Sequence, residues 1–234
     1  LCDTNTPANC ASVADTITVS AAITPATESG TAVSGTASTA IANVRSNDTV
    51  NGAAASAANA TIATSGSWPA GITLNTTSGA IAVAASVAPG SYSVTYQLCD
   101  TNTPANCASV ADTITVSAAI TPATESGTAV SGTASTAIAN VRSNDTVNGA
   151  AASAANSTIA TSGSWPAGIT LDTTSGAIAV AASVAPGSYS VTYQLCDTNT
   201  PANCASVADT ITVSAAITPA TESGTAVSGT ASTA

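Results

Sequence analysis

The six cysteines are the residues of this chain best suited to chemistry. They form three pairs, and each pair encloses the same seven residues within the repeated stretch LCDTNTPANC, which begins at Leu1, Leu98 and Leu195. A zinc site needs four ligands, whereas each pair supplies two thiolates and the chain has no histidine. A redox dithiol favours a Cys-x-x-Cys spacing beside a helix N-terminus, which is absent here. Free thiols and disulfides remain as the two alternatives.

The residues around each pair predict a β-hairpin that brings its two sulfurs together. In SYSVTYQL the apolar residues from Tyr92 to Leu98 alternate with polar ones, so Cys99 falls on the opposite, outer face of the strand. Cys107 begins the next alternating stretch and also falls on the outer face. Adjacent outward positions at the neck of a hairpin allow a cross-strand disulfide. We expect three disulfides and hence an oxidising compartment, extracellular or periplasmic: Cys2–Cys10, Cys99–Cys107 and Cys196–Cys204.

Groups that could support catalysis are scarce. Without histidine, a Ser-His-Asp arrangement is impossible. Asp100 and Asp112 could face each other across the hairpin, but hydrogen bonding within the loop is the more ordinary role for such residues. The stretch TSGSWPAG is glycine-rich yet lacks the lysine of a phosphate-binding loop. We therefore expect no enzyme and assign no catalytic residue.

A few side chains are candidates for binding or modification. Trp68 and its copy Trp165 are placed either to stack on a sugar ring or to plug the core at a sheet edge. Arg45 and Arg142 are the two cations of the chain, and we expect each to pair with a nearby acid. Triplets of the N-glycosylation pattern Asn-x-Ser/Thr give the candidate sugar-bearing residues: Asn47, Asn59, Asn75, Asn144 and Asn156.

The charge balance excludes two classes of partner. Twelve acids against two arginines give a net charge of −10. Nucleic-acid binding requires Lys and Arg to neutralise phosphates, and an anionic membrane surface attracts the same residues. No apolar run approaches the roughly 20 residues that span a bilayer. We expect no nucleic-acid partner and no membrane insertion in this segment.

The chain is a tandem repeat with a period of 97 residues. Its two full copies differ at two positions, where Ala60 becomes Ser157 and Asn75 becomes Asp172. This period is the size of a small domain with its own core and is too long for a solenoid turn. We place repeats at 21–117 and 118–214. We assign 1–20 as the final strand of a preceding repeat and 215–234 as the opening strand of a following one.

Each repeat contains about seven short stretches of strand-like alternation and no amphipathic helical stripe. They are GTAVSG, TAIANV, ATIATS, GITLNT, GAIAVA, YSVTYQLC and ASVADTITV. We predict an all-β fold of tandem immunoglobulin-like β-sandwiches, with about seven strands per 97-residue repeat. Asp112 interrupts the apolar face of its strand, so we expect a β-bulge or a sheet edge there.

Two stretches carry a family resemblance. SWPAGITLNTTSGAIAVAASVAPGSYSVTYQLCD, at 67–100, resembles the immunoglobulin-like and cadherin-like repeats of large bacterial cell-surface proteins. IANVRSNDTVNGAAAS, at 41–56, is similar to the Asn-Asp-Thr segment of related adhesin repeats. Together they cover about half of each repeat. The resemblance implies a secreted, array-forming protein of the cell surface.

The same resemblance raises the question of calcium. Related repeats often bind Ca²⁺ between domains through the acid-rich pattern Asn-Asp-Thr-Asp-x-Asp-Gly, whereas here Asp48 is followed by Thr49, Val50 and Asn51. One carboxylate rarely suffices, because Ca²⁺ takes about 6–8 oxygens. We expect no cofactor and keep Asp48 and its copy Asp145 as calcium candidates. The alternative is that Asp48, with Asn47, caps a turn.

These observations favour a structural role. We expect a repeat segment of an extracellular filament, stalk or fibril on a bacterial surface, which supplies length and stiffness. The alternatives are an adhesin arm that binds carbohydrate or protein, and a pilus-like fibre joined by strand complementation. Because the chain has no lysine to protect its sheet edges, we expect its partners to be copies of itself, associated laterally or head to tail.

Overall fold

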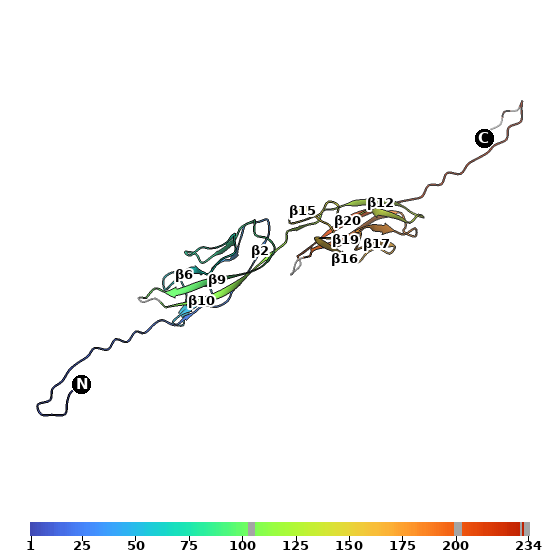
Figure 1. Cartoon of the computed structure of the whole chain (residues 1–234). Coiled ribbons are helices and arrows are strands. Elements are labelled where there is room, and N and C mark those ends of the chain that lie inside the picture. Colours follow the sequence, from blue (N-terminus) through green and yellow to red (C-terminus); the bar gives the residue numbers. More distant parts are fainter. Residues whose placement is uncertain (103–105, 199–202, 230, 232–234) are drawn as a thin grey trace. The chain divides into compact units, whose positions relative to one another are not determined.

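The computed structural model describes residues 1–102, 106–198, 203–229 and 231, and all regular structure in these ranges is β-strand (Figure 1). The chain divides into two compact units, Leu1–Val116 and Ser117–Ala234. The strands of the first unit are β1 (Ile23–Thr24), β2 (Ser29–Val33), β3 (Ser38–Ile41), β4 (Thr49–Val50), β5 (Ala53–Ala54), β6 (Ala60–Ser65), β7 (Ile72–Leu74), β8 (Ile81–Val83), β9 (Gly90–Asp100) and β10 (Cys107–Ser117).

The second unit repeats this order. Its strands are β11 (Ile120–Thr121), β12 (Ser126–Val130), β13 (Ser135–Ile138), β14 (Thr146–Val147), β15 (Ala150–Ala151), β16 (Ser157–Ser162), β17 (Ile169–Leu171), β18 (Ile178–Val180), β19 (Gly187–Asp197) and β20 (Cys204–Ser214). The seven strands expected in each repeat are all present. Three further strands of two residues each were not predicted: β1, β4 and β5, with their copies β11, β14 and β15.

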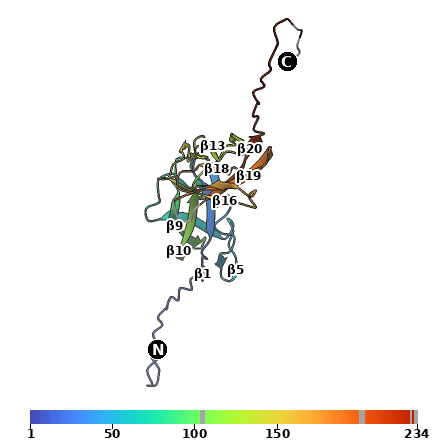
Figure 2. The ribbon, with the colours of Figure 1, turned by 90° about the vertical axis from the view of Figure 1, so that its right-hand side faces the viewer.

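The seven longer strands of each unit form the two layers of a β-sandwich. One sheet has the order β2-β10-β9-β6 and the other the order β3-β8-β7, while the short strands make a small third sheet, β1-β4-β5. Figure 2 shows β9 and β10 running side by side as the long central hairpin of the four-stranded sheet. The second unit has the same three sheets. The predicted all-β immunoglobulin-like sandwich is confirmed.

The alternation of apolar residues builds the core between the layers. Val94, Tyr96 and Leu98 of β9 are at most 1% exposed, and Ile81 of β8 faces them at 0%. Branched aliphatic side chains suit the pleated surface of a strand, and full burial of each contributes about 1.5–3 kcal/mol. Because the core has few aromatic rings, each repeat depends on close packing of many small side chains.

Asp112 does not create a β-bulge. The β9–β10 ladder runs without a break from Cys107 opposite Cys99 to Val116 opposite Gly90, and Asp112 lies opposite Val94. The residue instead marks the point at which a second neighbour joins the strand, because the N–H of Thr113 donates to the carbonyl oxygen of Glu28 just before β2 begins. In the second unit, β20 pairs with β12 from Thr210 onward. The β-bulge that the sequence suggested at Asp112 was therefore wrong.

The segments outside the two sandwiches are extended and exposed. Residues 1–20 repeat the sequence of 98–117, but the pairing described among them is a bridge between Cys2 and Cys10. Apolar side chains that are buried in β10 are exposed here, such as Ile17 at 86%. In 215–229, Ile217 is exposed to 88%. The assignment of these two segments to neighbouring repeats stays a prediction.

Candidate functional site

The cysteines of each repeat form a disulfide across the central hairpin. Cys99 and Cys107 lie directly opposite each other in the β9–β10 ladder, with their Cα atoms 4.1 Å apart and their sulfurs bonded. Cys196 and Cys204 are bonded in the same way in the second unit. Cys2 and Cys10 form the third disulfide. The bond closes the hairpin neck from the outer face of the sheet, as the alternation predicted.

Removal of a hairpin disulfide is expected to destabilise its repeat by about 2–3 kcal/mol, the chain-entropy value for a loop this short. The change is the double substitution Cys99→Ser and Cys107→Ser, and the measurement is urea unfolding followed by tyrosine and tryptophan fluorescence. The matched control is Cys2→Ser with Cys10→Ser, because that disulfide lies in an exposed segment outside the sandwich. Equal effects of the two double variants would contradict the prediction.

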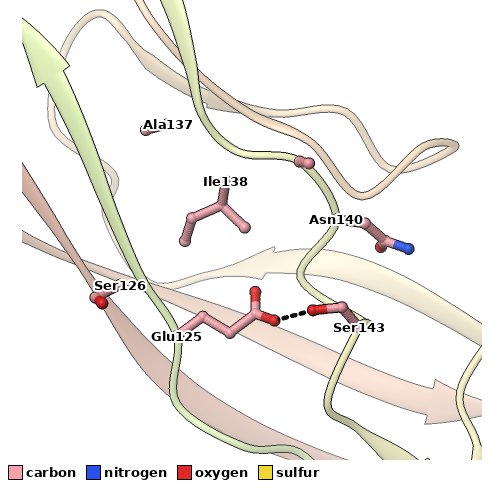
Figure 3. Close-up of a pocket in the computed structure, with 7 residues that line it drawn as sticks. Glu125, Ser126, Ala137, Ile138, Asn140 and Ser143 are labelled. Atoms are coloured by element: carbon pink, nitrogen blue, oxygen red, sulfur yellow. Dashed lines mark hydrogen bonds between the residues drawn. The ribbon is translucent and has the colours of Figure 1, made fainter.

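A groove that contains one carboxylate lies beside the start of β12 in the second unit. It has a volume of about 390 Å³, and its lining includes Glu125, Ser126, Ile138, Asn140 and Ser143. Figure 3 shows the Glu125 carboxylate and the Ser143 hydroxyl facing each other, and the hydroxyl donates a hydrogen bond to Oε1. The other carboxylate oxygen, Oε2, is buried without a hydrogen-bond partner. Sequence reasoning missed this groove, because serine and glutamate 18 positions apart form no motif.

A second carboxylate lies in the interior behind this groove. Asp209 of β20 is 0% exposed, and its Oδ1 accepts a hydrogen bond of 2.8 Å from the N–H of Glu125, whereas its Oδ2 has no partner. Burial, with a smaller contribution from the negative charge of Glu125, raises the pKa of Asp209 to about 6. Asp112 and Glu28 repeat this arrangement in the first unit, where burial likewise raises the pKa of Asp112 to about 6.

The calcium candidates are buried and already hydrogen-bonded. Asp48 is 1% exposed; its Oδ1 accepts a 2.8 Å bond from the N–H of Ala26, and its Oδ2 lies 2.7 Å from the hydroxyl of Tyr96. That hydroxyl is also 3.0 Å from the carbonyl oxygen of Val44. Burial raises the pKa of Asp48 and of Tyr96. The side chain of Asp48 therefore bonds residues that lie 22 positions before it and 48 positions after it in the sequence. Capping of a turn would instead be a local contact.

Asp145 makes the same contacts in the second unit, to Ala123 and Tyr193. Within the described ranges no three or more acids, cysteines or histidines come together in a way that could hold a metal ion. A calcium ion at Asp48 or Asp145 would have to displace the bonds that these carboxylates make. Calcium binding by this chain stays untested.

Asp100 and Asp112 do not face each other as a carboxylate pair. Asp112 is opposite Val94, six residues from Asp100 along β9. Asp100 is 2% exposed, and its Oδ1 accepts a 3.0 Å bond from the N–H of Asn106 at the hairpin end. Its contacts are those of a loop residue, and the two carboxylates cannot act together on one substrate.

The tryptophans lie against the core with their indole nitrogens engaged. Nε1 of Trp68 donates a 2.7 Å hydrogen bond to the carbonyl oxygen of Thr95, and the half-buried ring packs against the hydrophobic core. Trp165 bonds Thr192 at 2.8 Å in the second unit. Of the two alternatives, these contacts correspond to a core plug. Sugar stacking on the exposed part of either ring stays a prediction.

In the part of the chain that the structure describes, the arginines bond backbone carbonyl oxygens and form no ion pair with an acid. Arg45 is 4% exposed, and its Nη2 and Nη1 donate to the carbonyl oxygens of Thr76 and Thr77, at 2.9 and 3.3 Å. Arg142 bonds Thr173 and Thr174 in the same way. The expected ion pairs were therefore wrong. The cause is the turn after β7, whose carbonyl oxygens accept hydrogen bonds from both Nη atoms, while Nε is buried without a partner.

The three glycosylation candidates of the first repeat differ in how their amides are used. Nδ2 of Asn59 donates a 3.0 Å bond to the carbonyl oxygen of Ala54, and Nδ2 of Asn47 a 3.4 Å bond to that of Thr27. Asn75 is exposed and uses its Oδ1 to accept the N–H groups of Thr77 and Ser78. In the second repeat, Asn144 and Asn156 match Asn47 and Asn59. Attachment of sugar at any of these residues stays a prediction.

The charged residues of each repeat lie mainly inside it. In the first repeat Arg45, Asp48, Asp100 and Asp112 are at most 4% exposed, and Glu28 is half-buried. In the second repeat Asp172 is an exposed acid. Buried charges are normally rare unless hydrogen-bonded, as these are. The surface of each repeat therefore consists largely of alanine, serine, threonine and asparagine.

Residues 15–119 match the family model described as "Putative Ig domain". The second repeat differs from the first at two positions, so the sequence pattern that this family model matches recurs in the second repeat. No curated protein matches the sequence. Across the described ranges, the chain has no helix with the length and hydropathy that crossing a bilayer requires.

Solved chains that the structure matches include two cadherins. Mouse cadherin-23 EC22-24 is 14% identical with a TM-score of 0.36, over 84% of this chain and 64% of that one. Drosophila N-cadherin EC1-4 is 13% identical with a TM-score of 0.34, over 83% of this chain and 49% of that one. The chain thus spans 49% and 64% of the length of these two solved chains.

Proposed function

We propose that this chain is a force-bearing segment of an extracellular fibre, in which each sandwich resists extension along the chain. We propose more specifically that the fibre is a filament or stalk on a bacterial surface, in which copies of the chain associate laterally or head to tail. The immunoglobulin-like family match and the hairpin disulfides support an extracellular structural or adhesive repeat.

The observation that carries the proposal is the parallel pairing of the first and last long strands of a repeat. β12 pairs with β20 in parallel, from Ser126 opposite Thr210 to Val130 opposite Ser214. The chain enters the repeat through the short strand β11, a few residues before β12, and leaves it just after β20. Tension on the two ends therefore pulls these strands in opposite directions along their length. All hydrogen bonds between them are loaded together, and none can be opened one at a time.

The experiment is to extend single molecules and to weaken this pairing by one bond. The N–H of Ser131 donates a 2.9 Å bond to the carbonyl oxygen of Ser214. Ser131 and Gly132 are the two central residues of a turn in which the N–H of Thr133 donates to the carbonyl oxygen of Val130. Gly132 has a φ of +88°. Proline suits the second position of such a turn, so Ser131→Pro removes the N–H without opposing the backbone.

Wild type is expected to unfold in two events of similar force, each of which releases roughly 300 Å of chain. Ser131→Pro is expected to lower the force of one event and leave the other, from the unaltered first repeat, as an internal reference. Ser131→Ala is the matched control, because it removes the bond from Oγ to the Val184 carbonyl oxygen but keeps the N–H. Equal forces for the two variants would overturn the proposal.

A further inference from the structure

We propose that β6, and its copy β16, is an association edge that pairs antiparallel with the same strand of a second copy of this chain. The inference rests on the proposed fibre and identifies the strand through which copies of the chain associate laterally. It would join two four-stranded sheets into one continuous sheet across a two-fold axis.

The position of β6 in its sheet leaves one side open. In the order β2-β10-β9-β6, β6 has β9 as its one neighbour, and the pairing runs from Ala60 opposite Asp100 to Ser65 opposite Thr95. Ala60 and Ile62 are buried at 1% and 6%, which fixes the strand to the core. Thr61 and Ala63 are exposed. The strand therefore presents backbone N–H and C=O groups at its open side, apart from the N–H of Ala60, which donates to the carbonyl oxygen of Ser56.

The other edges are shorter. At the opposite edge of the same sheet, β2 has five residues, whereas β6 has six. In the three-stranded sheet, the edge strand β7 has three residues, whereas β6 has six. The longest free edge of each repeat is thus β6 or β16.

The usual protections of an edge strand are missing from β6. Natural sheets guard their edges with lysine, proline, bulges or covering segments. The sequence of β6 is ATIATS, and its register with β9 is unbroken. The corresponding strand of the second repeat, STIATS, is equally free of charge and proline. Because β6 and β16 carry no charged residue, two copies of this edge can pair without placing like charges opposite each other, despite the net charge of −10.

The test places lysines on the edge strands and compares them with lysines elsewhere on the same sheet. The edge variant carries Thr61→Lys, Ala63→Lys, Thr158→Lys and Ala160→Lys. The control variant carries Ser93→Lys, Thr113→Lys, Ser190→Lys and Thr210→Lys, on the central strands β9, β10, β19 and β20. All eight positions are exposed, so both variants add the same charge outside the core. Circular dichroism and melting verify that each variant folds.

Sedimentation velocity over a range of concentrations gives the readout. Wild type is expected to self-associate, the edge variant to associate at least tenfold more weakly, and the control variant to stay within about threefold of wild type. A second measurement uses wild type alone: association is expected to slow amide hydrogen exchange in β6 and β16 and not in β7 and β17.

Three results would overturn the inference: a wild type that is monomeric throughout, equal weakening by both sets of lysines, or no weakening by either. Unchanged exchange in β6 and β16 on association would overturn it as well. Each of these outcomes leaves the force-bearing function standing, because the extension experiment is made on single molecules and depends on β12 and β20.

Discussion

The chain is expected to be more stable at pH 4 than at pH 7, the reverse of the behaviour of most proteins with ionised surface acids. Burial raises the pKa of Asp112 and Asp209 in the folded state to about 6, from an ordinary value of 3.8. A raised folded-state pKa contributes stability that is complete below the unfolded value and is lost as the pH rises through the folded value. The loss therefore falls between about pH 4 and pH 6.

A rise of the folded-state pKa from 3.8 to about 6 changes the free energy of unfolding by about 3 kcal/mol per repeat, taken as an order of magnitude. The raised pKa of Asp48 acts in the same direction. Thermal unfolding monitored by calorimetry from pH 3.5 to pH 8 measures the effect. The physical cause is local: Oδ2 of Asp112 and of Asp209 is buried without a partner, so the ionised form is poorly solvated in the folded state.

The double variant Asp112→Asn with Asp209→Asn is expected to flatten this pH dependence. Asparagine keeps an oxygen that can accept the N–H of Glu28 or Glu125, but it does not ionise. The matched control is Asp172→Asn, an exposed acid at a position where the first repeat already has Asn75. The pKa of Asp172 is lowered by N–H groups of its turn, so the control leaves the slope between pH 4 and pH 6 unchanged. Stability that rises from pH 4 to pH 7 in wild type would contradict the prediction.

The sandwich could be predicted because its strands carry a strong period-two signal. The stretch from Tyr92 to Leu98 alternates without exception, and the same alternation places Cys99 on the outer face. The strands that escaped prediction, β1, β4 and β5, have two residues each, which is too short for any periodicity. Their pairing depends on where the two large sheets bring them.

The charged interior was harder to foresee, because its partners are backbone groups. Arg45 bonds carbonyl oxygens of a turn 31 and 32 residues later, and Asp48 bonds an N–H 22 residues earlier. Every residue offers such groups, so no residue type marks the contact. A usable signal existed for Asp100, which is in phase with Tyr96 and Leu98 and is buried with them. For Asp112 the alternation indicated the inward face, but the Glu28 N–H that meets it could not be read from sequence.

Gly30→Ala is expected to destabilise the first repeat by about 3 kcal/mol, although it adds a single methyl group. A Cβ at Gly30 would be 2.5 Å from the carbonyl oxygen of Ala40 and 2.9 Å from Cγ1 of Ile41. The carbonyl belongs to the backbone of β3 and cannot rotate away as a side chain would. β2 and β3 would have to separate, and β2 is the strand that the four-stranded sheet holds against β10. Urea unfolding of the purified variant measures the loss.

The matched control is Gly35→Ala, five residues further along the chain. Gly35 has a φ of +86° and nothing within 4 Å of a new Cβ, so the substitution tests backbone strain without steric overlap and is expected to cost about 1 kcal/mol. Gly127→Ala repeats the test in the second unit, where the Ala137 carbonyl oxygen is also 2.5 Å away. Equal costs for Gly30→Ala and Gly35→Ala would mean that β2 and β3 are free to move apart.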